Sequence, residues 1–166
     1  MQDTPMDSPE DTSTPLDRFV QAAGFNPRDW TAHLNAHGHS GFIGMRYHGH
    51  GTDWIELAFD WREELVGDPE TGVLASGPII SLLDNATSMS VWTRMGRFCP
   101  QVTLDLRIDY TRAAAPRKPI IARAECYQVR RSMAFVRGIA HDGDITDPVA
   151  HAAGIFMLVD GQEWVK

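Results

Sequence analysis

The sequence has few cysteines, few basic residues and no long apolar run. Its two cysteines, Cys99 and Cys126, are too few for a disulfide framework. No apolar run reaches the roughly 18 residues that a transmembrane helix needs, so we expect no membrane span. The first 17 residues, MQDTPMDSPEDTSTPLD, are acidic and lack the apolar centre of a signal peptide. These absences favour a cytoplasmic protein.

The charge balance also excludes partners. The net charge is −7 at pH 7, whereas nucleic acids and anionic membranes both favour a basic protein surface. We therefore expect neither as a partner, although a local basic patch for a small anionic ligand is compatible with this charge. The 43% of apolar and 22% of charged residues are typical of a soluble globular protein.

The chain length of 166 residues predicts one domain. Residues 1–15 are rich in Pro, Ser, Thr, Asp and Glu, a composition typical of a disordered tail. Residues 16–166 form the predicted single domain. Apolar residues at helical spacing predict a short helix from Leu16 to Ala23, and a second is expected from Pro27 to about His37.

A long buried helix is expected between Gly77 and Thr93, in the stretch GPIISLLDNATSMSVWT. It is apolar on almost every side, which is typical of a helix inside a protein. Pro78 suits the first helical position, where its missing N–H costs nothing. Asp84 is the only ionisable residue in this helix. A buried carboxylate is expensive unless it is paired, hydrogen-bonded or protonated, so Asp84 is the first functional candidate.

Six segments are predicted to be strands, two before this helix and four after it. A turn at Gly49 and Gly51 separates the first two, and residues 62–74 are expected to be a loop that leads to the helix. Sequential strands joined by short turns favour an antiparallel sheet, so the predicted class is α+β with a sheet curled around one helix. The predicted strands are Phe42–His48, Asp53–Trp61, Gln101–Thr111, Lys118–Arg130, Met133–His141 and Pro148–Val159.

The strand Gln101–Thr111 alternates strictly between apolar and polar residues. This pattern predicts two faces. One carries Val102, Leu104, Leu106, Ile108 and Tyr110, and the other carries Thr103, Asp105, Arg107 and Asp109.

Five of the seven histidines lie between His33 and His50. A histidine-rich tract can bind metal, but the spacing HLNAHGH…HGH matches no metal-ligand pattern. We interpret these histidines as structural or solvent-exposed and predict no metal site.

Four stretches resemble one known family. They are the loop REELVGDPETGVL, the helix start GPIISLLDNA, the strand VTLDLRIDYTRAA and the turn segment RRSMAFVRG. Their order resembles the hotdog fold, and their residues resemble the phenylacetate-type acyl-CoA thioesterases of the 4-hydroxybenzoyl-CoA thioesterase superfamily. Three residues in two stretches depart from the family pattern. Ala75-Ser76-Gly77 stands where the family commonly has His-Gly-Gly, and Ala113 replaces a proline.

The residues and the resemblance together predict a catalytic site. The free N–H groups at the start of a buried helix suit a developing oxyanion, and Gly77 is the first choice of donor. The resemblance implies that Asp84 acts as general base or nucleophile in a site shared between two subunits. It also implies that Thr103 of the partner subunit holds the attacking water. Alternatively, Asp84 is a structural carboxylate and Thr103 an ordinary strand residue.

Further residues are predicted to bind the substrate. Arg112, Arg130 and Arg131 suit the phosphates of coenzyme A, because arginine binds phosphate well, although charged residues at strand ends are often only solvated. Ser76 and Asn85, on either side of the catalytic positions, complete the predicted set. No cofactor is implied besides the acyl-CoA substrate.

The predicted function is acyl-CoA thioester hydrolysis by a homodimer or homotetramer. The main alternative is a non-catalytic acyl-CoA-binding hotdog protein, in which Ala75-Ser76-Gly77 has replaced a working loop. A hotdog hydratase is a weaker alternative, because that reaction needs a catalytic histidine and the central helix has none.

Overall fold

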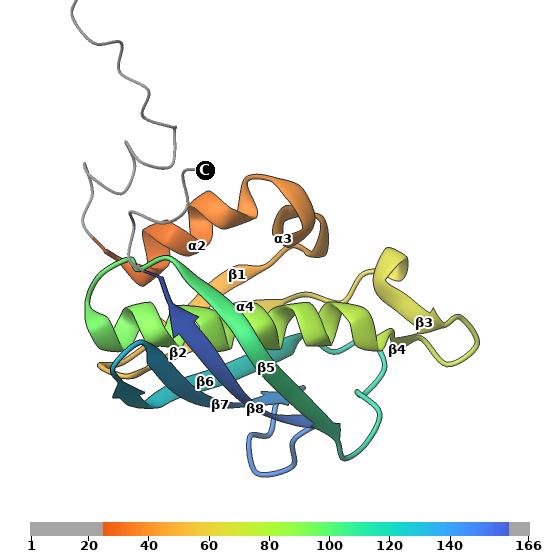
Figure 1. The fold of residues 1–166 in the computed structure, drawn as a ribbon. Coiled ribbons are helices and arrows are strands. Elements are labelled where there is room, and N and C mark those ends of the chain that lie inside the picture. The colour runs from red at the N-terminus through yellow and green to blue at the C-terminus, as the bar shows by residue number, and fades with distance from the viewer. Residues whose placement is uncertain (1–24, 160–166) are drawn as a thin grey trace, which may run out of the picture.

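An antiparallel sheet curls around the long helix α4 (Ser76–Met95) in the computed structural model, which describes residues 25–159 (Figure 1). Each neighbouring pair of strands in this six-stranded sheet is antiparallel. The order across the sheet is β1 (Arg46–His50), β2 (Trp54–Phe59), β6 (Ile120–Arg130), β7 (Met133–His141), β8 (Ala150–Leu158) and β5 (Gln101–Tyr110). The predicted α+β class and the enclosed central helix are confirmed.

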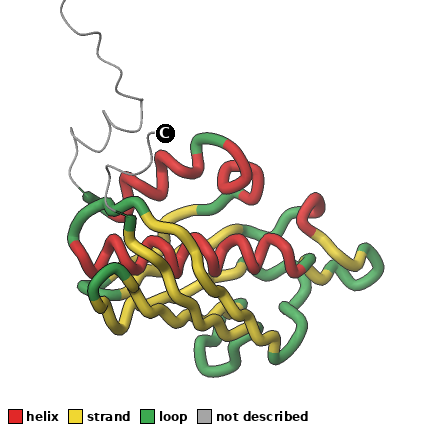
Figure 2. Tube along the Cα trace, in the orientation of Figure 1, coloured by secondary structure: helices red, strands yellow, loops and turns green. Residues whose placement is uncertain are grey.

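Smaller elements surround this body. Helices α2 (Pro27–Asn35) and α3 (Gly38–Ile43) lie on one side of α4 (Figure 2). A 3₁₀ turn η1 (Glu63–Leu65) leads into a small hairpin near the start of α4, formed by β3 (Val66–Asp68) and β4 (Val73–Leu74). No helix among residues 25–159 is long and apolar enough to cross a membrane. The predicted tail 1–15 and the predicted helix Leu16–Ala23 lie outside the described residues.

Two predictions about the segments before α4 were wrong. The predicted strand Phe42–His48 begins only at Arg46, because Phe42 and Ile43 belong to α3. Gly44 ends this helix in the left-handed conformation, with φ 70°, and its N–H bonds back to α3 carbonyls. The predicted loop 62–74 contains η1 and the β3–β4 hairpin.

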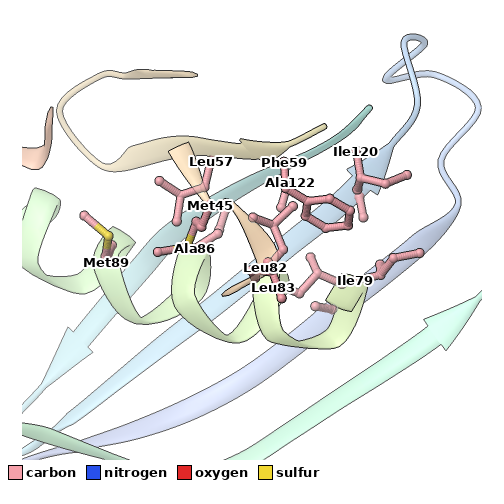
Figure 3. Close-up of a cluster of buried hydrophobic side chains, with 14 of the residues drawn as sticks. Met45, Leu57, Phe59, Ile79, Leu82, Leu83, Ala86, Met89, Ile120 and Ala122 are labelled. Atoms are coloured by element: carbon pink, nitrogen blue, oxygen red, sulfur yellow. The ribbon is translucent and has the colours of Figure 1, made fainter. Parts of the chain in front are cut away.

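Helix α4 begins two residues earlier than predicted and ends close to the expected place. Pro78 is its third residue. At this position a backbone N–H would have no intrahelical acceptor, so the proline costs the helix no hydrogen bond. Gly96 ends the helix with φ 63°. The buried side of α4 packs on β2 and β6 (Figure 3), and the fully or almost fully buried side chains there include Ile79, Leu82, Leu83, Ala86 and Met89 from the helix with Leu57, Phe59, Ile120 and Ala122 from the strands.

Small residues cover the face of β6, β7 and β8 that looks toward α4. They are Ala122, Ala124, Ala134, Gly138, Ala140, Ala150, Ala152 and Gly154, all buried. A Cβ on Gly138 would lie 3.4 Å from the methyl group of Thr87 on α4. A Cβ on Gly154 would lie 2.8 Å from the Asp105 carbonyl oxygen on β5. These residues allow the sheet to approach the helix closely and to curl around it.

A β-bulge at Leu104 overturns the predicted faces of strand β5. Thr103 pairs with Phe156 and Asp105 pairs with Ile155, so Leu104 is an extra residue. Such a residue shifts the alternation by one position. Thr103 therefore shares the inner face with Leu106, Ile108 and Tyr110, which pair with the buried residues Gly154, Ala152 and Ala150. Leu104, predicted to share the apolar face with them, is 54% exposed.

The close approach of β5 to β8 can be tested with Gly154→Ala. The new Cβ would press on the Asp105 carbonyl, so we expect a loss of about 1–3 kcal/mol in the free energy of unfolding, measured by urea denaturation. Gly49→Ala is the control, because its Cβ would meet its nearest neighbour at 3.5 Å, an ordinary contact. Equal stability of the two variants would show that β5 does not depend on this glycine.

Candidate active site

The start of α4 has two backbone amides without a protein acceptor. The Ala75 N–H donates to the Leu65 carbonyl at 2.9 Å, and Pro78 has no N–H. Among the first four positions this leaves the amides of Ser76 and Gly77, for which residues 25–159 provide no acceptor. Ala75 supplies no side-chain cap. The positive end of the helix dipole and two free donors therefore point to the same place.

The space in front of this helix start is open. Ser76 and Gly77 are both exposed, and a Cβ built on Gly77 would meet nothing within 4 Å. Strand β5 fixes the backbone from the other side, because the Tyr110 hydroxyl donates to the Ser76 carbonyl at 3.0 Å. A carbonyl oxygen of a ligand can thus approach the two amides directly.

Asp84 lies further along α4, half-buried, with its carboxylate beside strand β5. The Thr103 hydroxyl donates to Asp84 Oδ1 at 3.4 Å. Burial raises the pKa of Asp84 above its usual range, and the hydrogen bond from Thr103 offsets part of this rise. A carboxylate with a raised pKa is a stronger base, which suits general base catalysis.

The Asp84–Thr103 pair forms within one chain. The resemblance implied that Thr103 would come from a partner subunit, but the bulge at Leu104 turns Thr103 toward the helix of its own chain. Within the chain, the helix start lies further from Asp84. Asp84 follows Gly77 by seven positions, or about 10 Å along the helix axis at 1.5 Å per residue.

His39 contacts helix α4 near Asp84, which the sequence did not reveal. Its Nε2 lies 2.9 Å from the hydroxyl oxygen of Ser81, one turn before Asp84, and this hydroxyl also donates to the Gly77 carbonyl at 3.0 Å. Nothing in the spacing of the histidines indicates this contact, because it depends on helix α3, which was not predicted. Among residues 25–159, no group of His, Cys, Asp or Glu side chains is placed to hold a metal ion.

The predicted substrate-binding residues do not gather around Asp84. Asn85 donates to the Ser81 carbonyl of its own helix at 2.8 Å. Arg112 forms a bidentate pair with Asp142 at 2.7 and 2.8 Å. It also reaches Asp147 at 3.0 Å. Arg130 and Arg131 are exposed at the β6–β7 turn, remote in sequence and in the sheet from the loop that holds Arg112.

These features define a class of protein. A curled antiparallel sheet around one central helix is the hotdog fold. Comparison with known proteins places the chain within that class.

Residues 71–149 match the model of the thioesterase superfamily. A protein from Pseudomonas aeruginosa with a crystal structure is 32% identical, with a TM-score of 0.72 over 80% of this chain and 98% of that chain. The chain therefore belongs to the thioesterase superfamily. Among curated proteins, no sequence matches it.

Two more distant structures share the fold. A thioesterase from Haemophilus influenzae is 17% identical, with a TM-score of 0.74 over 86% of this chain and 96% of that chain. A mutant of the phenylacetic acid degradation protein PaaI from Thermus thermophilus is 23% identical, with a TM-score of 0.61 over 72% of this chain and 96% of that chain. At these identities the likeness concerns the fold alone.

We expect Arg112→Ala to weaken folding and to leave the KM for substrate unchanged. The pKa of Asp142 is lowered from 3.8 to about 2, chiefly by the hydrogen bonds from Arg112 and in part by the Ala115 N–H. The whole shift corresponds to about 2 kcal/mol at neutral pH, most of it from Arg112. Because the folded pKa is depressed, this stability is present above pH 3.8 and is lost as the pH falls toward 2. Urea denaturation at pH 7 measures it.

The control for this prediction is Arg107→Ala, which removes an exposed ion pair with Asp109 and should cost less than about 1 kcal/mol. A normal stability of Arg112→Ala together with a raised KM for acyl-CoA would show that Arg112 binds substrate phosphate after all.

Asp84→Asn should stabilise the folded protein at neutral pH. Folding raises the pKa of Asp84, so the folded state holds this proton more tightly than the unfolded state. The free energy of unfolding of the wild type then falls relative to that of the variant as the pH rises from the unfolded-state pKa of Asp84 to its higher folded-state pKa. Above the folded-state pKa, the difference in stability between the two proteins is constant. Melting temperatures between pH 3.5 and 8 test this, with Asp105→Asn on the exposed side of β5 as the control. A destabilised Asp84→Asn protein at pH 7 would indicate a structural carboxylate.

Proposed function

We propose that this protein is an acyl-CoA thioesterase in which Asp84 acts as a general base. The observation that carries this proposal is the half-buried Asp84 carboxylate, which accepts a hydrogen bond from the Thr103 hydroxyl of β5. Asp84 belongs to the same helix that presents two free amides at its start. Membership of the thioesterase superfamily supports the reaction class.

The proposed step is hydrolysis by an activated water. Asp84 takes a proton from the water while the water oxygen attacks the thioester carbon. The negative charge that forms on the carbonyl oxygen is stabilised by the amides of Ser76 and Gly77. The carbon–sulfur bond then breaks, and the thiolate takes the proton from Asp84. The products are a carboxylic acid and the free thiol of coenzyme A.

The geometry favours a site formed by two copies of the chain. The thioester group must lie about 3 Å from two things at once. One is the water held by Asp84, and the other is the pair of amides that bind the carbonyl oxygen. Within one chain the two are separated by about 10 Å along α4. We therefore infer that the helix start of one copy faces the Asp84–Thr103 pair of another, which requires a homodimer or a larger homo-oligomer.

The first test is the activity of Asp84→Asn. We expect thioester turnover to fall by about 100-fold or more, because the amide cannot accept the proton of the attacking water. Release of free thiol from a panel of acyl-CoA substrates measures this. Full activity of the variant would refute the mechanism. A wild-type protein that binds acyl-CoA without releasing thiol would establish the alternative of a non-catalytic binding protein.

The second test asks whether the two amides and the Asp84 carboxylate of one site come from different chains. It uses two variants, each placed in a different chain of a dimer. Ser76→Pro removes one amide donor at a helical position that tolerates proline. A purified mixed dimer has Ser76→Pro in one chain and Asp84→Asn in the other. If each site is formed by both chains, one of the two sites carries both changes and the other site carries neither. We expect about half of the wild-type activity, although each homogeneous variant is nearly inactive. A mixed dimer as inactive as its parents would show that each site lies within one chain.

A further inference from the structure

A pocket of about 410 Å³ lies between helix α2 and the edge strand β1. One wall is the face of α2 that carries Arg28 and Asn35, two residues seven positions apart and hence on the same side of the helix. The other wall is residues 45–48 of the chain, at the beginning of β1. β1 has β2 on one side and no further strand in the described sheet on the other.

The walls of this pocket are basic. Arg28 and Arg46 line it together with His48, whose Nε2 lies 4.0 Å from the Glu56 carboxylate, and no carboxylate is among the lining residues. Arg28 forms no ion pair with residues 25–159, and its guanidinium carbon lies 5.2 Å from the centre of the Tyr47 ring. Arg46 pairs with Asp60 at 3.0 Å, but both side chains are exposed, and such pairs contribute little. In a chain with a net charge of −7, the pocket is a local site for an anion.

Asn35, one of the residues that line the pocket, has an acceptor without a donor. Asn35 Oδ1 is buried and has no hydrogen-bond partner among the described residues. A buried acceptor without a donor costs about 1–3 kcal/mol, so a ligand N–H at this position would be favourable. The planar guanidinium of Arg28 offers in addition a surface on which a nucleobase can stack.

We propose that this pocket binds the nucleotide end of the acyl-CoA substrate, an assignment that rests on the proposed function. Phosphate groups would lie on Arg28 and Arg46, and the amino group of adenine would donate to Asn35 Oδ1. Arg112, by contrast, is held by Asp142 and Asp147.

The pocket lies beside the helix that carries Asp84. Thr31, which also lines the pocket, contacts Met89 on α4, with Oγ1 and Sδ 3.8 Å apart. Met89 follows Asp84 by five residues, which is about 8 Å along the helix axis. The flexible pantetheine arm of coenzyme A would join the two places.

Direct binding can be measured with adenosine 3′,5′-bisphosphate as the probe, by calorimetric titration of the full chain. We expect Arg28→Ala and Arg46→Ala each to weaken binding by about tenfold or more, and binding to weaken as salt is added. Asn35→Asp, which removes no acceptor, should retain a site for the adenine amino group. Arg137→Ala is the matched control, an exposed arginine on the outer face of the sheet. No binding by the wild type, or equal binding by all variants, would overturn the proposal.

Kinetics distinguish the substrate from another phosphate ligand. With acyl-CoA, Arg28→Ala should raise KM by about tenfold and leave kcat nearly unchanged. With the same acyl group on N-acetylcysteamine, which has no nucleotide, KM should not change. An unchanged KM for acyl-CoA, despite lost bisphosphate binding, would overturn the assignment to the substrate. A wild-type protein that binds the bisphosphate through Arg28 and Arg46 but hydrolyses no thioester would uphold the pocket and refute the proposed function.

Discussion

The structure depends on the close approach of the sheet to helix α4. A single helix buries enough apolar surface only if strands cover it from several sides, and large side chains on the strands would hold them too far away. The alanines and glycines of β6, β7 and β8 remove this obstacle. At Gly138 a Cβ would already lie 3.4 Å from the Thr87 methyl group of α4.

The same close approach places polar groups of β5 on the helix. Gln101 donates to the Ser88 carbonyl at 2.8 Å, Thr103 to Asp84 at 3.4 Å and Tyr110 to the Ser76 carbonyl at 3.0 Å. Strand β5 thus crosses α4 obliquely (Figure 1) and contacts the helix through three of its side chains. The structural contacts at the two ends fix the strand, and the middle contact supports the candidate catalytic carboxylate.

Electrostatics give the arginines different roles in an acidic chain. Arg112 lies beside two acidic residues and cross-links the end of β5 to the loop after β7, which makes it part of the fold. Arg28 and Arg46 stand at the rim of an open pocket with no carboxylate in its lining. Residue type alone does not separate these roles, because the counter-ions of Arg112 lie 30 and 35 positions away in the sequence.

The sequence by itself determined the main elements and the candidate catalytic residue. The apolar run from Ile79 to Trp92 required a buried helix, its one carboxylate marked Asp84, and the alternating segments required strands, because these patterns are local and reflect burial directly. Only the tertiary structure decided which way Thr103 points, since a bulge depends on pairing with β8 and leaves the alternating pattern in the sequence unchanged. It also decided that His39 reaches Ser81 and that Arg112 is occupied by Asp142, because contacts between distant segments follow from packing and not from spacing along the chain.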